Sequence, residues 1–264
     1  MTNDSIITTK GKNTMLYRMY TANGSLSSTE YLTPTKFKVG ISNQTPNIAD
    51  TNLSILIPLT YGTVCDNGDN QLTGSSGGSS STTGKINNGR TYNGSVNDNV
   101  TSNMGITNAF TISFWVKHSD YSNADYVFRK RPSSGDANEI RIGWLSNELR
   151  AMIVDSSGSG GSDYKDYRGN TTLVNNTTYF VTVTWDGTDL HIYLNGSQDT
   201  PYDKVTDDST ITLAQNSDEW GIGGWSTSYN DIDMVDEVGI WSVAKTSGEI
   251  GTGAGTLYNS GSGL

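Results

Sequence analysis

The chain has few of the cysteine and histidine residues that cross-link a small fold through disulfides or bound metal ions. Its 264 residues include one cysteine, Cys65, and two histidines, His118 and His191, which are not spaced as zinc ligands. Internal disulfides are therefore excluded, and no resident cofactor is expected. Prolines number only five, and no apolar run approaches the roughly 20 residues of a membrane span. We expect a protein with no membrane span, held together by packing and hydrogen bonds.

Positive charge is scarce as well. The 17 lysines and arginines face 27 acidic residues, and the formal net charge is −10. Such a surface repels phosphate, which argues against nucleic acid as a partner. Residues 1–62 hold five lysines and arginines against three acidic residues, whereas residues 63–264 hold twelve against twenty-four. A faintly basic first section therefore precedes an acidic body.

The chain is rich in glycine, serine, threonine and asparagine, and its apolar residues alternate with polar ones. In TTYFVTVTWDGTDLHIYLNG (177–196), two runs of period two are separated by Asp186-Gly187 and closed by Asn195-Gly196. Period two is typical of half-buried strands, and these pairs tolerate the positive φ of tight turns. Similar short strands recur, and one helical turn is expected near 245–250. The pattern predicts an all-β protein, an antiparallel two-sheet β-sandwich.

A segment of glycine, serine and threonine divides the chain. Residues 74–84, GSSGGSSSTTG, have the composition of a flexible linker. The sandwich is expected over 85–264, and a small β-rich region over 1–73. Three strands are expected in that region: 15–20, 36–41 and 53–57. They are too few for an independent core, so we interpret 1–73 as an attachment region that needs a neighbour.

Four motifs follow one another in the second section. They are GKINNGRTYNGSVND (84–98), FTISFWVK (110–117), YFVTVTWDGTDLHIYLNG (179–196) and DMVDEVGIW (233–241). Together they resemble the laminin-G-like jelly roll of the concanavalin A-like superfamily, which has a Gly-Lys-x-x-x-Gly start and a Trp-Asp-Gly hairpin. The resemblance implies two antiparallel sheets packed face to face. It says less about activity, since the superfamily includes lectins, carbohydrate-binding modules, glycosidases and adhesion domains.

A second resemblance concerns the first section. FKVGISNQTPNIADTNLSILIP (37–58) is similar to a Val-Gly-x-x-x-x-x-Pro-x-x-x-Asp-Thr-x-Leu pattern of structural proteins from tailed-phage virions. That resemblance implies a protein attached to a head, tail or fibre. The start of the chain, MTNDSIITTKGKN, has no apolar segment of a secretory signal. We expect a protein made in the host cytoplasm and located on the virion surface.

These observations favour a phage virion surface structural protein of the capsid decoration or head-fibre type. Residues 1–62 are expected to bind other virion proteins of the capsid or tail. We expect a homo-oligomer, with a trimer as one option, and weak adhesion to a cell-surface glycan strengthened by multivalent display. Two alternatives stay open: a tail fibre or receptor-binding protein, and a free carbohydrate-binding protein or glycosidase of the same superfamily.

DIDMVDE (231–237) is the main candidate for catalysis. Laminarinase-type glycosidases on the related fold use Glu-x-Asp-x-x-Glu, with a carboxylate pair about 5–5.5 Å apart. Here Asp231, Asp233 and Asp236 occupy the three places, so the shorter aspartate replaces both outer glutamates. Asp236 has the parity of the apolar residues after it, which predicts a core-facing carboxylate that accepts hydrogen bonds from loop amides, with Glu237 facing solvent. We therefore expect no enzyme.

Acidic residues in turns supply a candidate metal site. Asp231, Asp233 and Asp98 are candidate ligands of calcium, which laminin-G-like and lectin folds hold at a loop rim through hard oxygen ligands. Calcium is the one cofactor left open.

A glycan site needs an aromatic platform with polar groups beside it. Strand parity and the loop WGIGGWSTSYND (220–231) nominate candidates for such a platform. They are Trp220, Trp225, Tyr229, Tyr193, His191 and Trp115. The same parity turns Arg150 outward, and it turns Trp144 and Trp185 toward the core.

Overall fold

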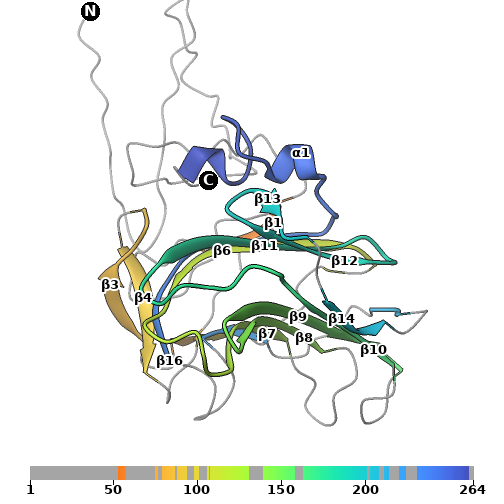
Figure 1. Ribbon diagram of the computed structural model, residues 1–264, viewed down its shortest axis with the longest axis horizontal. Helices are drawn as coiled ribbons and strands as arrows, with labels where there is room; N and C mark the ends of the chain where they lie inside the picture. The colour runs from red at the N-terminus through yellow and green to blue at the C-terminus, as the bar shows by residue number, and fades with distance from the viewer. Residues whose placement is uncertain are drawn as a thin grey trace, which may run out of the picture. The chain divides into compact units, whose positions relative to one another are not determined.

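The computed structural model describes much of the second section of the chain and a short piece of the first (Figure 1). The described residues are 53–57, 75–76, 79–86, 88–93, 98–100, 106, 108–130, 139–157, 163–200, 203–207, 211–213, 220–223 and 231–261. All of them belong to one compact unit, Lys38–Leu264, and they form two antiparallel sheets that face each other. The predicted all-β sandwich is thereby confirmed.

Eight strands of the described residues form the first sheet. Seven follow in spatial order: β13 (Ser197–Gln198), β12 (Leu190–Leu194), β11 (Thr178–Trp185), β6 (Phe110–Lys117), β16 (Asp231–Trp241), β4 (Asn88–Asn93) and β3 (Ser80–Thr83). The eighth, β1 (Leu53–Ile57), pairs with the second half of β16, while β4 pairs with the first half. The apolar run LSILI, expected in the attachment region, is therefore a strand of the jelly-roll sheet.

Eight strands of the described residues also form the second sheet. Their spatial order is β14 (Asp203–Asp207), β10 (Tyr164–Arg168), β9 (Glu148–Val154), β8 (Ile140–Leu145), β7 (Asp125–Lys130), β15 (Trp220–Ile222), β5 (Asp98–Val100) and β2 (Ser75–Ser76). The long strands β7 to β10 are consecutive hairpin neighbours, so the middle of this sheet follows the order of the chain.

Strands β2 and β3 lie inside the segment that composition predicts as a flexible linker. Ser80 is opposite Thr91 and Thr83 is opposite Asn88. The linker prediction is wrong for these residues, because a strand at a sheet edge needs backbone hydrogen bonds and not apolar side chains. The strands expected at 15–20 and 36–41 lie outside the described residues. The division of the chain into an attachment region and a jelly roll stays a prediction.

The hairpin of β11 and β12 has the form that its sequence predicts. Its register pairs Val181 with Leu194 and Trp185 with Leu190. In the turn after β12, Asn195 has a φ of 51° and Gly196 a φ of 79°. These are the left-handed conformations that asparagine and glycine tolerate best. The local pattern therefore determines both the strands and the turn.

The main core lies between the two sheets. Its largest members include five fully buried side chains: Trp144, Trp185, Trp220, Phe114 and Phe128. Trp144 and Trp185 are 1% and 0% exposed, so the parity prediction for them is confirmed.

A second apolar cluster lies on the outer face of the first sheet. Its members are Trp115, Phe180, Tyr193, Trp241, Ile250 and Leu257. The last two belong to residues 245–261, here called the C-terminal cover, which lies on the side of this sheet away from the second sheet (Figure 1). The outward residues of the first sheet are therefore packed against the end of the described chain.

The C-terminal cover begins with the helical turn that the sequence predicts. α1 (Ser247–Ile250) is preceded by Thr246, whose hydroxyl accepts a hydrogen bond from the backbone of Glu249 while the Glu249 carboxylate accepts one from Thr246 N (2.8 Å). This reciprocal capping fixes the turn. A 3-10 turn, η1 (Asn259–Gly261), follows. No helix within the described ranges is long and apolar enough to cross a membrane.

Candidate functional site

The carboxylates of β16 have separate surroundings. Register shifts against β4 and β6 interrupt the alternation of the strand. Asp231 and Asp233 are exposed, whereas Asp236 is 1% exposed. The Cα partner of Asp236 is Trp115 of the outer cluster, so the carboxylate is buried on the outer side of the sheet. Parity predicts the burial correctly but the side wrongly, because the shift between Asp236 and Gly239 breaks the alternation.

Asp236 joins β16 to the turn before β4. Its Oδ2 accepts a hydrogen bond from Ile86 N (2.8 Å) and its Oδ1 accepts one from Glu237 N (2.9 Å). Burial raises the pKa of Asp236 to about 6, even though these bonds favour the ionised form. A Cβ on Gly84 would lie 2.5 Å from Oδ2, so the first glycine of the Gly-Lys-x-x-x-Gly motif makes room for this carboxylate. Asp236 therefore has the backbone-binding role that the sequence predicts.

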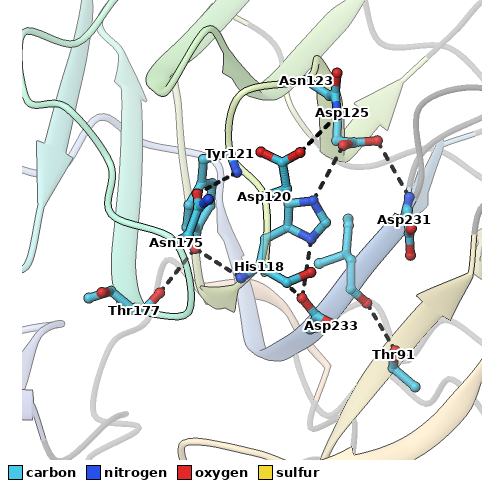
Figure 2. Close-up of polar contacts among 12 residues, drawn as sticks. Thr91, His118, Asp120, Tyr121, Asn123, Asp125, Asn175, Thr177, Asp231 and Asp233 are labelled. Carbon is cyan, nitrogen blue, oxygen red and sulfur yellow. Dashed lines mark hydrogen bonds and ion pairs between the residues drawn. The ribbon is translucent and has the colours of Figure 1, made fainter.

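A second polar cluster surrounds His118, where β6 ends and β7 and β16 begin (Figure 2). His118 is 4% exposed and stacks on Trp144 with ring centroids 5.1 Å apart. Its Nε2 lies 3.8 Å from Asp125 Oδ2, and its Nδ1 lies 3.3 Å from Asp233 Oδ2. Asp233 also accepts a hydrogen bond from Ser119 N. One buried imidazole thus lies between carboxylates of two different strands.

Tyr121 holds the loop that follows β6. Its hydroxyl accepts a hydrogen bond from His118 N (3.1 Å) and donates one to Thr177 O (3.1 Å), and its backbone N–H donates to Asn175 Oδ1 (3.0 Å). Burial raises the pKa of Tyr121 above its usual value, so the hydroxyl remains a donor. Burial also raises the pKa of Asp125 to about 6. The cluster is a packed structural junction with one carboxyl group that titrates close to neutral pH.

The predicted calcium ligands come from both sheets. Asp231 and Asp233 are on β16, and Asp233 is engaged with the loop after β6. Asp98 is on β5 of the second sheet, opposite Ile222, and its side chain lies outside the description. Among the side chains that the structure describes, no group of three histidines, cysteines or acidic residues is arranged to hold a metal ion. Calcium binding stays a prediction.

Trp115 and Tyr193 point away from the main core, as strand parity predicts, but they are buried. Trp115 is 2% exposed and Tyr193 is 5% exposed. Tyr258 of the C-terminal cover stacks near Trp115 with ring centroids 5.8 Å apart, and Leu257 joins the same cluster. An exposed platform at these two residues is a wrong prediction, because a segment distant in sequence covers this part of the sheet.

The other predicted glycan-binding residues are dispersed. Trp220 is 0% exposed in the main core, with its ring centroid 5.9 Å from that of Phe128, so it offers no platform either. His191 is partly exposed, and its Nε2 lies 3.6 Å from Asp186 Oδ2. Trp225 and Tyr229 lie outside the described residues, and their role stays a prediction. Of the four predicted residues that the structure describes, His191 alone reaches the surface.

Charged side chains take the outward positions in the middle of the second sheet. Alternate residues of β8 are in the main core, so Arg141 between them points outward. The same alternation turns Arg150 of β9 and Arg168 of β10 outward, and Arg129 of β7 is opposite Arg141. These four arginines lie with two acidic residues on one face. We call the following set the arginine face: Arg129, Arg141, Glu139, Arg150, Arg168 and Asp166.

One acidic residue bridges the first pair of arginines. The Glu139 side chain is 0% exposed; its Oε1 accepts a hydrogen bond from Arg129 Nε (2.6 Å), and its Oε2 accepts one from Arg141. The Tyr126 ring lies 5.8 Å from the Arg129 guanidinium and 5.9 Å from that of Arg141, within the range of cation–π attraction. Both arginines are therefore held in place by the protein itself.

The second pair of arginines is arranged differently. Arg150 is opposite Arg168, and Asp166 gives both of its oxygens to Arg150, at 2.8 Å and 2.7 Å. This bond raises the pKa of Arg150 above its usual value. The Nε of Arg168 is buried and has no hydrogen-bond partner among the side chains that the structure describes.

The sequence contains part of the signal for this face. YVFRK, EIRIGW and ELRAMIV each place an arginine at the parity opposite to core residues, and parity alone predicts an outward Arg150. The pairing of Arg150 with Arg168 and the sharing of Glu139 depend on the register between strands. A single sequence does not give that register.

Two antiparallel sheets packed face to face, with the strands in this order, are consistent with a jelly-roll domain. A family model described as the concanavalin A-like lectin/glucanases superfamily matches residues 93–251. The match spans more than half of the chain, and the chain belongs to this superfamily. The fold is shared by glycosidases and by non-catalytic binding domains. No curated protein sequence matches the chain.

Solved structures with the same fold are mostly binding domains. Domain 4 of AbnA, a GH43 extracellular arabinanase from Geobacillus stearothermophilus solved in complex with arabinotriose, is 17% identical with a TM-score of 0.59, over 75% of this chain and 96% of that one. The binding domain of Paraclostridial Mosquitocidal Protein 1 is 17% identical with a TM-score of 0.60, over 79% of this chain and 52% of that one. The botulinum neurotoxin serotype G binding domain is 17% identical with a TM-score of 0.58, over 78% and 50%. The chain thus spans about half of the toxin binding domains, and the likeness concerns the fold.

Proposed function

We propose that the protein is a surface structural protein of a phage virion, of the capsid decoration or head-fibre type, and that its jelly roll is a non-catalytic glycan-binding domain. Membership of a lectin and glucanase superfamily supports a binding module. The similarity of residues 37–58 to virion structural proteins supports attachment to a particle. The arginine face is the observation that carries the binding role, because it is a polar, partly exposed surface on rigid strands.

The surroundings of the acidic residues support the absence of catalysis. A retaining glycosidase needs two carboxyl groups about 5–5.5 Å apart on either side of a sugar. Asp236 is buried and its two oxygens accept backbone hydrogen bonds, while Asp233 is engaged with Ser119 and His118. Two of the three aspartates in the candidate motif are therefore engaged with the protein itself. The domain is therefore proposed to bind sugars without cleaving them.

Partial exposure of the arginine face supports contact with a ligand. The side chains of Arg129, Arg141 and Arg150 are 12%, 21% and 20% exposed. Guanidinium groups present several fixed N–H donors to sugar hydroxyl or carboxyl oxygens. A single contact of this size is weak, but many copies on one particle bind with high avidity.

A glycan panel tests the binding role directly. Full-length protein is applied to immobilised oligosaccharides, and bound protein is measured beside the release of reducing sugar ends. We expect binding to a subset of glycans without hydrolysis. Hydrolysis that is lost in Asp231→Asn would contradict the proposal and establish the glycosidase alternative, whereas the absence of any binding would contradict the glycan role.

Antibody labelling of phage particles tests the location. Gold particles on the head under the electron microscope are the expected result for a decoration or head-fibre protein. Gold on the tail would favour the alternative of a tail fibre or receptor-binding protein. Absence from purified particles would favour a free carbohydrate-binding protein.

Self-association through residues 1–62 is proposed as the means of assembly. Light scattering of the full chain is expected to give the mass of a defined oligomer, with a trimer as the first model to fit. Removal of residues 1–52 keeps β1 in the sheet and is expected to give a monomer. An unchanged mass after this deletion would contradict the proposed role of the attachment region.

A further inference from the structure

We propose that Arg168, beside Arg150 on the outer face of the second sheet, binds the carboxylate of an acidic sugar, a uronic or sialic-type residue within a glycan. This inference rests on the proposed function, since it names the class of glycan and the residue that selects it. Its basis is the difference between the two arginine pairs of the arginine face.

Each pair consists of two arginines and one acidic residue, but the hydrogen bonds of the acidic residue differ between the two pairs. Glu139 divides its two oxygens between Arg129 and Arg141, so both members of the first pair are neutralised together. Asp166 gives both oxygens to Arg150 in a bidentate bond. Arg168 Nε donates no hydrogen bond to Asp166. A second carboxylate, supplied by a ligand, would complete the second pair as Glu139 completes the first.

The position of Arg168 favours a ligand over water alone. Its Nε is buried and has no hydrogen-bond partner among the described side chains, and the residue as a whole is partly exposed. A charged donor that is shielded from water without a partner costs free energy, whereas a planar carboxylate matches the fork of a guanidinium. Arg150 lies directly opposite and adds positive charge to the same spot. The site is therefore built for one carboxylate.

Neighbouring residues favour a sugar acid over a dense polyanion. Tyr164 and Arg168 are the two partly exposed ends of β10, and both point to the outer face because they are four positions apart, an even spacing. At about 3.4 Å per residue their Cα atoms are about 14 Å apart, a span that an oligosaccharide covers. Glu148 follows the same outward alternation on β9. Its negative charge repels closely spaced phosphates or sulfates, so isolated carboxylates suit the face better.

Paired glycans test the inference. The panel holds uronic-acid and sialic-acid oligosaccharides, each beside its carboxyl-reduced form, and titration calorimetry measures the affinity of the full-length protein at low salt. We expect the acidic forms to bind at least about 10-fold more tightly than their reduced counterparts, because an arginine–carboxylate contact is charge-assisted. Comparison of the two acid classes identifies the sugar.

Two variants assign the effect to the residue. Arg168→Gln is expected to weaken binding of the acidic glycan about 10-fold and to leave the reduced form unaffected. Lys85→Gln makes the same change of charge at an exposed residue beside Trp115, on the outer side of the first sheet, and is expected to change the affinity by less than about 2-fold. Circular dichroism confirms the fold of both variants.

The outcomes separate this inference from the proposed function. If reduced and acidic glycans bind equally, or if Arg168→Gln binds the acidic glycan like the unaltered protein, the carboxylate site is wrong while glycan binding stands. If no glycan of either kind binds, both proposals are wrong. If acidic glycans bind and Arg168→Gln alone loses them, both are supported.

Discussion

The outer faces of the two sheets differ in composition and in exposure, although both sheets belong to the same sandwich. Both sheets place apolar residues toward the shared core, but their outward residues differ. On the first sheet these include Trp115 and Trp241, which are 2% and 1% exposed under the C-terminal cover. On the second sheet they include Arg141 and Arg150, whose side chains are 21% and 20% exposed. The first outer face packs within the chain, and the arginine side chains of the second are partly exposed to solvent.

The two faces differ in how they contribute to stability, because one buries apolar surface area and the other carries ion pairs near the surface. Burial of an aromatic side chain is favourable at about 25 cal/mol per Å² of apolar area, so the covered face contributes to stability. Partly exposed ion pairs contribute little, about 0–1 kcal/mol each, unless the acidic partner is buried. Substitutions on the two faces should therefore separate into effects on folding and effects on binding.

Trp115→Ala is expected to have the largest effect. The substitution removes a buried ring that contacts Phe180 and Tyr258, with centroids 4.9 Å and 5.8 Å away. We expect the free energy of unfolding to fall by about 3–5 kcal/mol, the usual cost of deleting a large buried aromatic side chain. Unfolding in guanidinium chloride measures this change in the free energy of unfolding.

Val174→Ala is the matched control for an apolar residue, since Val174 is 60% exposed. Its unfolding free energy should stay within about 0.5 kcal/mol of the unaltered protein. A loss below about 1 kcal/mol for Trp115→Ala would show that the C-terminal cover does not hold this face in solution, and the comparison of the two faces would fail.

Glu139→Gln is expected to have the next largest effect. The change keeps the shape of a side chain that is 0% exposed but removes the charge shared by Arg129 and Arg141. Breaking a buried pair leaves uncompensated charge, and partial exposure of the arginines limits the cost to roughly 2–3 kcal/mol. Thermal unfolding measures this loss of stability, and Glu148→Gln, a change at a partly exposed acidic residue on the same outer face of the second sheet, is the control. Equal effects of both changes would show that Glu139 contributes only surface charge.

Local patterns predict the inner faces of this protein well. The mostly apolar run LSILI and the alternating run FTISFWVK give β1 and β6 at the predicted residues. The turn residues after β12 give the hairpin. In each case the information lies within one strand and its turn, where hydrophobic period and positive φ act directly.

The outer faces depend on contacts that no local pattern contains. Parity turns Trp115 outward correctly, but its burial follows from Leu257 and Tyr258, which are distant in sequence. Parity misplaces Asp236 because a register shift in β16 is invisible in the sequence. The pairing of Arg168 with Arg150 likewise requires the register of β9 with β10. Candidate sites on outward residues therefore could not be predicted from the sequence alone, because they depend on strand register and on contacts between distant segments.

Lowering the pH from 7 to 5 is expected to stabilise the fold, because two buried carboxyl groups become protonated. The pKa values of Asp125 and Asp236 are raised from 3.8 to about 6 by burial. Between these values the folded state holds protons that the unfolded state has lost, so stability falls as pH rises through about 6. We expect the Tm to decrease from pH 5 to pH 7, as measured by scanning calorimetry.

Asp125→Asn is the variant that sharpens this expectation. An amide does not titrate, so the variant should have a flatter dependence of Tm on pH, with Asp236 supplying the remaining slope. Asp236 adjoins the covered face through its Cα partner Trp115, whereas Asp125 belongs to the cluster around His118. A variant with the slope of the unaltered protein would show that Asp125 is not the group that titrates.

Arg168→Gln is expected to have the smallest effect on stability and the opposite sign. Arg150 and Arg168 are like charges directly opposite each other on neighbouring strands, an arrangement that destabilises a sheet. Removing one of them should raise the free energy of unfolding by about 0.2–0.5 kcal/mol at low salt. The gain should vanish near 1 M salt, where the screening length is about 3 Å. A loss of stability instead would mean that Arg168 has a structural partner, and then the arginine face would resemble the covered face in being built for folding. A gain would mark a residue kept at the expense of stability, which is the expected signature of a binding residue.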